Sequence, residues 1–240
     1  LRGAIAAVLL GIAASAAAQN YPACPIRIIV PFPAGGGVDT AGRLLGVKLS
    51  EAIGRPVLVD NRAGANGMIG SEMVAKAPKD GYTLMVSSSS YITNAAIRSV
   101  RYDPIADFQP ITKLTTNPYL IVVTPSLPVK TVTDLINLAK AKPDSITYAS
   151  SGTGGVLHLG GELLATLAGI KMTHVPYKGV ADGYPAVISG QVNWMLGSPI
   201  SAQPLIKAGR LRGIAVTTEK RLKALPELPA IAETVPGYEV

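Results

Sequence analysis

Short apolar runs alternate with amphipathic stretches along most of the chain, and the two patterns predict strands and helices in turn. In the first half, β-branched apolar runs predict strands at 27–30, 57–59 and 83–86. Apolar residues recur at helical spacing over 41–53 and 68–75, between those strands. Because strands and helices alternate, we expect a largely parallel, doubly wound α/β arrangement.

The pattern starts again near residue 120. Thr131 and Asp134 form a capping pattern at the start of a predicted helix over 132–141. Further strands are expected at 120–123, 147–149, 172–175, 192–196 and 213–216, and further helices over 156–167 and around Ala186 and Leu205. The two series predict two α/β lobes with a hinge, and the Pro-rich stretch 125–128 lies near the expected crossing.

The N-terminus has the pattern of a secretory signal peptide. Arg2 precedes an uncharged run over 3–14, and Ala16 and Ala18 provide a small-x-small cleavage pattern. A membrane anchor is the alternative, but the apolar stretch 5–12 is too short to span a bilayer. We therefore expect a periplasmic protein divided into a signal peptide (1–18), the first part of lobe 1 (19–124), lobe 2 (125–218) and a return towards lobe 1 (219–240).

Glycine-rich loops follow a predicted strand and precede a predicted helix in both lobes. Glycine lets the main chain approach a ligand, and free N–H groups at a helix start attract a carboxylate or phosphate. Tight βα turns are the alternative explanation for each loop taken alone. The candidate ligand-binding residues in these loops and the helices after them are Phe32, Ala34, Gly35, Gly36 and Asp39 in the first lobe and Ser151, Gly152, Thr153, Gly154 and His158 in the second.

Hydroxyl groups after other strands extend the candidate site. Ser88 and Ser89 follow the strand at 83–86, at the end of a strand where open α/β sheets place their ligands. Tyr177 ends another strand, and Lys178 beside it could pair with an acid. Solvated turns are the alternative for the serines, while Trp194 and His174 lie in apolar strands and are expected to be structural.

Composition and motifs exclude several classes of function. The 240 residues are 48% hydrophobic and only 15% charged, with a formal net charge of +7. Basic residues are scattered without interleaved aromatic residues, so attraction of a small anion explains the charge better than nucleic acid does. Neither glycine loop fits a nucleotide fingerprint, and the two histidines and single Cys24 provide neither a nucleophile–base pair nor a metal cluster. We therefore expect no enzymatic activity, cofactor or metal.

Several ordered motifs resemble the Bug family, the receptors of tripartite tricarboxylate transporters, and the similarity runs from Tyr21 to the end. The motifs are 28–36 with Asp39, 59–67 with 69–70, 78–84, 102–104 with Asp107, Phe108 and Pro110, 148–154 with 158–159, and 175–179. This resemblance implies a type II periplasmic-binding fold that closes on a carboxylate, held largely by backbone amides and bridging waters of the two glycine loops. It also implies that 60–67 lies near the cleft mouth.

The resemblance further implies a monomeric receptor that delivers a small mono- or dicarboxylate to membrane permease subunits. A periplasmic sensor that docks on a membrane histidine kinase is an alternative with the same fold, and an α/β hydrolase or transferase is a third. Two departures from the family pattern are Gly197, where relatives often carry an acidic or polar residue, and the end at Val240, because relatives run some tens of residues further. On that basis we expect a chain truncated at its C-terminus.

Overall fold

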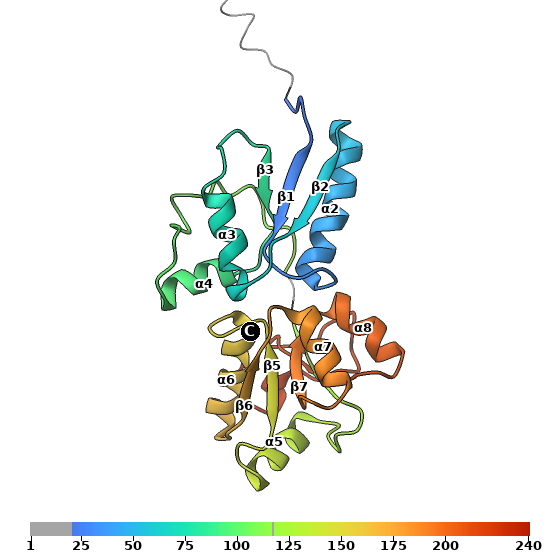
Figure 1. Ribbon diagram of the computed structural model, residues 1–240. Helices are drawn as coiled ribbons and strands as arrows, with labels where there is room; N and C mark the ends of the chain where they lie inside the picture. The colour runs from blue at the N-terminus through green and yellow to red at the C-terminus, as the bar shows by residue number, and fades with distance from the viewer. Residues whose placement is uncertain (1–20, 117) are drawn as a thin grey trace, which may run out of the picture.

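The computed structural model describes residues 21–116 and 118–240, which form two α/β lobes (Figure 1). The predicted signal peptide lies outside the described residues. The first lobe contains a parallel sheet of order β2-β1-β3, and the second contains a sheet of order β6-β5-β7-β4-β8. The strands are β1 (Ile26–Val30), β2 (Val57–Asn61), β3 (Thr83–Met85), β4 (Leu120–Val123), β5 (Thr147–Ser150), β6 (Thr173–Pro176), β7 (Trp194–Gly197) and β8 (Arg212–Val216).

Helices flank both sheets. The first lobe has α2 (Gly37–Ile53), the 3₁₀ turn η1 (Ala65–Gly67), α3 (Met68–Ala75) and α4 (Ser90–Ile97). The second has α5 (Val132–Ala141), α6 (Val156–Ala168), α7 (Val180–Ile188), α8 (Pro199–Lys207) and the 3₁₀ turn η2 (Ile231–Glu233). The predicted elements are confirmed with shifts at their ends, and the Thr131–Asp134 capping box is present. Helix α4 was not predicted.

The first lobe is built around β1. Ile28, Ile29 and Val30 are fully buried because β1 is the central strand and helices cover the sheet. Gly42 and Gly46 on α2 let that helix pack closely on the side chains of Val30 and Val59. The helix ends where Gly54 adopts φ 65° and its N–H bonds to the Ser50 carbonyl.

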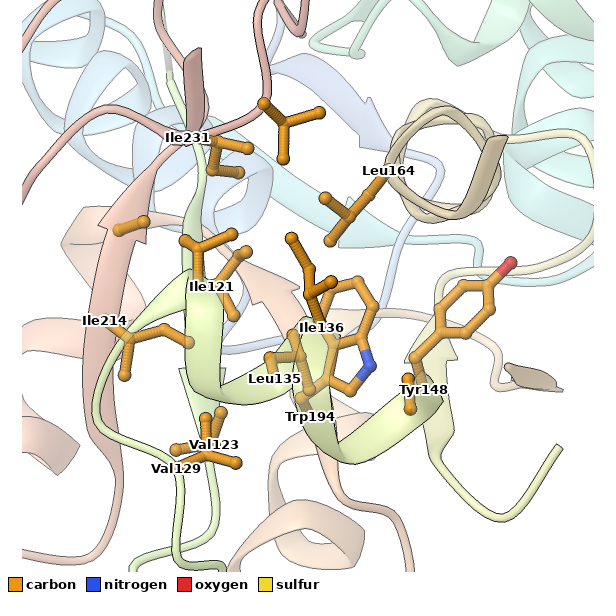
Figure 2. Packing of buried hydrophobic residues seen from close by; sticks show 14 of the residues in the cluster. Ile121, Val123, Val129, Leu135, Ile136, Tyr148, Leu164, Trp194, Ile214 and Ile231 are labelled. Atoms are coloured by element: carbon orange, nitrogen blue, oxygen red, sulfur yellow. The ribbon is translucent and has the colours of Figure 1, made fainter. Parts of the chain in front are cut away.

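The second lobe contains the larger core (Figure 2). Trp194 of β7 and Tyr148 of β5 stack with their ring centroids 5.2 Å apart, and the indole is fully buried. Leu135 of α5 and Leu164 of α6 cover them from the helix side. The expectation that Trp194 is a core residue is therefore confirmed.

Strand β4 differs from the expected pattern in direction and in sheet membership. It runs antiparallel to β7 and β8, whereas β5 pairs in parallel with β6 and β7. The chain reaches β4 from α4 through a segment whose described residues form no helix or strand, so no helical crossover sets a parallel direction. We expected lobe 1 to run to residue 124, but these pairings put β4 in the second sheet.

The described segment 219–240 packs on lobe 2, although we expected a return towards lobe 1. Ile231 and Tyr238 belong to the lobe 2 core, and the Tyr238 hydroxyl donates to the Gly160 carbonyl at 3.2 Å. Arg221 and Glu233 form an ion pair at 2.8 Å on the surface of this segment. Apolar burial on α6 and β7 explains why the segment follows lobe 2.

Candidate binding site between the lobes

The first glycine loop leaves β1 at Pro31 and is held in shape by Asp39. The Gly35 N–H, with φ +84°, donates to Asp39 Oδ2 at 2.8 Å, and Asn61 Nδ2 donates to Asp39 Oδ1 at 2.8 Å. Arg43 Nε lies 3.0 Å from the same carboxylate. Burial would raise the pKa of Asp39, but hydrogen bonds from Arg43, Gly35 and Asn61 hold it below its ordinary value. Both carboxylate oxygens of Asp39 therefore already accept hydrogen bonds within lobe 1.

Phe32 contributes to the same loop through its backbone rather than its ring. Phe32 is 8% exposed, and its ring packs beside Gly67. The Phe32 backbone carbonyl accepts from Asn61 Nδ2 at 3.0 Å. Among residues 21–116 and 118–240, no hydrogen-bond partner is found for the N–H groups of Ala34 and Gly36. The first loop therefore offers two backbone donors.

The second glycine loop connects β5 to α6 and bonds mostly to itself. Gly152 has φ +124° and its N–H donates to the Ser150 hydroxyl at 3.1 Å. The Gly154 N–H, with φ +77°, donates to His158 Nδ1 at 3.1 Å. Within the described chain, the N–H of Thr153 has no partner. His158 is thus engaged in shaping its own loop.

Asn66 joins the two lobes. The Ser151 hydroxyl of lobe 2 donates to Asn66 Oδ1 at 3.2 Å, while Asn66 Nδ2 donates to Asn94 Oδ1 at 3.0 Å. The Asn94 amide returns a bond to the Asn66 carbonyl at 3.0 Å, and both asparagines are at most 2% exposed. Asn66 adopts φ 55°, a conformation that asparagine tolerates better than most residues. Asn66 was noted only as part of a family motif, and Asn94 gave no sequence signal.

Arg98 makes a second connection between the lobes. It caps the C-terminus of α4, and its guanidinium donates to the Thr153 carbonyl in lobe 2. Ile97 and Arg98 both lie where a Cβ on Gly154 would stand. Sequence reasoning missed Arg98 because α4 was not predicted.

An open pocket of about 670 Å³ lies where these contacts meet. Lobe 1 lines it with Ala65, Asn66 and Arg98, and lobe 2 lines it with Gly152, Thr153, Pro176, Tyr177, Lys178 and Asp182. Three predicted site residues, Gly152, Thr153 and Tyr177, are among them. The lining supports the expectation that 60–67 lies near the cleft.

The remaining predicted residues are not among those that line this pocket. Gly35 lines a smaller pocket of about 330 Å³ against α7 and α8. Ser88 and Ser89 precede α4, where the Ser88 hydroxyl accepts a long bond from the Ser90 N–H at 3.4 Å. The second glycine loop therefore lines the larger pocket, whereas Ser88 and Ser89 lead into α4.

Two histidines lie behind the second loop. His174 of β6 and His158 of α6 have ring centroids 4.1 Å apart, and His174 Nε2 is 2.6 Å from the Ser150 hydroxyl. Burial and the neighbouring His158 lower the pKa of His174 to about 4, against a small opposing effect of Glu162. Burial also lowers the pKa of His158, with Glu162 opposing and Arg98 assisting. Both rings are therefore neutral near pH 7.

Acid is expected to destabilise the protein through His174. Its pKa falls from 6.5 to about 4 on folding, so the folded state binds the proton more weakly than the unfolded chain. The stabilisation is complete above pH 6.5 and is lost progressively as the pH falls towards 4. In His174→Gln the amide keeps a polar partner for Ser150 but cannot titrate, so melting temperature should depend less on pH across this window. An unchanged slope in the variant would contradict this assignment.

In the described part of the chain, no helix is both long and apolar enough to cross a membrane. Nor do three or more His, Cys, Asp and Glu side chains of this part gather where they could hold a metal ion.

Two α/β lobes that meet at a pocket define a type II periplasmic-binding-protein fold. A family model described as the tripartite tricarboxylate transporter family receptor matches residues 42–240. The chain belongs to this family, as its motifs led us to expect.

Individual relatives agree. A UPF0065 protein from the tcbD–tcbE intergenic region of Pseudomonas sp. (strain P51) is 40% identical over 223 residues, covering 92% of this chain and 66% of the relative. The structure of Rhodopseudomonas palustris Rpa4515 with adipate is similar at a TM-score of 0.89 and 39% identity, covering 92% of this chain and 75% of that one. MatC from the same organism, with bound malate, has a TM-score of 0.85 and 28% identity, covering 92% and 76%. The chain spans about two thirds of the length of these curated relatives.

Proposed function

We propose that this protein is an extracytoplasmic receptor that captures a small mono- or dicarboxylate and delivers it to the permease subunits of a tripartite tricarboxylate transporter. The observation that carries the proposal is the pocket between the lobes, which is lined by cationic side chains from both of them. The predicted signal peptide supports a periplasmic location, and the family supports the transporter as the partner.

The charges around the pocket favour an anion. Arg98 enters from lobe 1 and Lys178 from lobe 2, while Asp182 is the one acidic residue among the lining residues. The formal net charge of +7 for the whole chain acts in the same direction at long range. A carboxylate that reaches the cleft is therefore attracted to it before any short-range contact forms.

Backbone donors provide the short-range contacts in this proposal. The free N–H groups of Ala34 and Gly36 in one lobe and of Thr153 in the other can each donate to a carboxylate oxygen or to a bridging water. We keep the predicted site residues as the proposed site, in which Asp39 and His158 shape the two glycine loops, and add Asn66, Arg98 and Lys178 to it. Binding then draws on both lobes, so a ligand stabilises the closed arrangement in proportion to its better contacts there.

The ligands of two solved relatives narrow the proposed cargo. Adipate and malate are both dicarboxylates, and they occupy proteins that share 39% and 28% of their residues with this chain. A dicarboxylate can place its two charges on donors from opposite lobes. We therefore propose dicarboxylates in the size range from malate to adipate as the first candidates.

A thermal-shift screen against mono-, di- and tricarboxylic acids tests the proposal. An acid that binds only the folded protein raises the melting temperature in a concentration-dependent way. One or a few dicarboxylates should do so in the wild type. Gly152→Val should lose the shift, because valine is strained at φ +124° and its Cβ would press on Asn66.

Two outcomes would contradict the proposal. A folded wild-type protein whose melting temperature no acid raises is not a carboxylate receptor. A shift that persists unchanged in Gly152→Val would place the ligand elsewhere. Co-purification of the acid-loaded protein with permease subunits, rather than with the outer domain of a histidine kinase, tests the delivery step and separates transport from sensing.

A further inference from the structure

One peptide bond of the second glycine loop is held from both lobes. The Thr153 carbonyl accepts from the Arg98 guanidinium of lobe 1, and the Gly154 N–H donates to His158 Nδ1 of lobe 2 at 3.1 Å. Both groups belong to a single planar peptide unit, so the two contacts together define its rotation about the chain.

This peptide unit would rotate easily without those contacts. Gly152 and Gly154, on either side of Thr153, both have positive φ and carry no Cβ that restricts the backbone. Thr153 itself is exposed. The orientation of the unit matters for a ligand because the Thr153 residue contributes both a pocket wall and a free N–H group.

We propose that Arg98 and His158 act as a clamp on the Thr153–Gly154 peptide, so that the second glycine loop takes its ligand-binding shape only when lobe 1 closes on lobe 2. Arg98 and His158 are positioning residues in this inference. The consequence for ligand binding rests on the proposed receptor function: closure of the lobes and ordering of the second glycine loop are coupled.

The clamp requires a neutral His158 whose Nδ1 accepts a hydrogen bond. A proton on Nδ1 would face the Gly154 N–H and break the contact. The groups around the ring are Glu162 on α6, with its Oε1 3.9 Å from Nε2, His174 on β6, Tyr148 on β5 and Arg98 from α4. Arg98 is the one among them that comes from the other lobe.

Closure and proton release are therefore linked. When Arg98 approaches, its charge adds to burial in lowering the pKa of His158, against the opposing effect of Glu162. The closed state then binds the proton more weakly than the open state, so ligand affinity is full at neutral pH and decreases as the pH falls through the open-state pKa of His158, which burial already holds below its ordinary value.

Amide exchange without any ligand tests the clamp directly. Nuclear magnetic resonance would follow hydrogen exchange at the Gly154 N–H in the wild type, in Arg98→Gln and in Arg101→Gln. Loss of one hydrogen bond should make Gly154 exchange about fivefold faster in Arg98→Gln. Arg101→Gln is the matched control, since it removes the same charge from a nearby side chain that is 83% exposed and pairs only distantly with Glu72. Equal exchange in the two variants would overturn the clamp.

Two variants at His158 test the acceptor and the proton. Asparagine places Oδ1 near the position of the histidine Nδ1 and cannot be protonated, whereas phenylalanine keeps a ring without an acceptor. With adipate as the probe, His158→Asn should keep an affinity close to that of the wild type without its decrease in acid. His158→Phe should bind about fivefold to tenfold more weakly at neutral pH. Equal affinity of the asparagine and phenylalanine variants would also overturn the clamp.

The two experiments separate the clamp from the receptor function. If adipate and the other acids bind no variant but Arg98→Gln still accelerates exchange at Gly154, the proposed function fails and the clamp stands as a structural feature. If acids bind normally and exchange at Gly154 does not respond to Arg98, the function stands and the clamp fails.

Discussion

Replacing Gly155 by valine is expected to weaken dicarboxylate binding by about 100-fold, or roughly 3 kcal/mol. A Cβ at Gly155 would overlap the side-chain amide of Asn66, which lies in the other lobe. That amide cannot simply turn away, because it is bonded to Ser151 and Asn94 in a buried setting. Breaking two such bonds between buried groups costs about the stated amount. Isothermal titration calorimetry with adipate measures the change.

The backbone of Gly155 makes this variant a clean probe of the lobe contact. Its φ of −76° suits any residue, so valine adds no backbone strain and its effect comes from the overlap with Asn66. Asn66→Gly is the matching change, since it removes the overlapping atoms and accepts the φ of 55°. The double variant should bind no more weakly than Asn66→Gly alone. Wild-type affinity in Gly155→Val would show that the two lobes need not meet at Asn66.

Truncation of Trp194 to alanine is expected to cost about 4 kcal/mol of unfolding free energy. The indole is fully buried at the centre of the lobe 2 core, where it stacks on Tyr148 (Figure 2). The helices around it are anchored by their own strands and cannot collapse into the space, so a cavity remains. Denaturant unfolding followed by circular dichroism measures the loss.

Trp194→Phe is the matched control for this prediction. The indole N–H is buried without a hydrogen-bond partner among the described residues, so phenylalanine loses volume but also removes an unsatisfied donor. Its cost should stay below about 2 kcal/mol. If alanine proved as well tolerated as phenylalanine, the core around Trp194 would have to repack far more freely than its dense contacts indicate.

Local patterns predicted most of the elements because each depends on residues close in sequence. The Thr131–Asp134 capping box and the apolar stripe of α5 define that helix without help from the rest of the fold. The apolar run of β1 likewise identifies a strand that is buried on both faces. Helix α4 escaped prediction because it starts in a serine run, and Asn94 in its middle is polar yet fully buried. Its place depends on Asn66, which is distant in sequence.

Part of the candidate site could likewise be predicted from the sequence, and part could not. Glycine loops after strands are readable from the sequence, and both loops lie where the lobes face each other. The roles of Asp39 and His158 could not be predicted from the sequence, because they depend on which groups the folded loops place beside these side chains. Both are candidates for the site, and both bond within their own loops.

The sequence by itself determined the family, the alternation of strands and helices and the two glycine loops, since these follow from local spacing and composition. Only the tertiary structure decided that β4 runs antiparallel in the second sheet, that Asn66 joins the lobes and that Arg98 reaches Thr153. The physical reason is that such contacts form between residues far apart in the chain. Their geometry depends on how the two lobes pack, which no local pattern encodes.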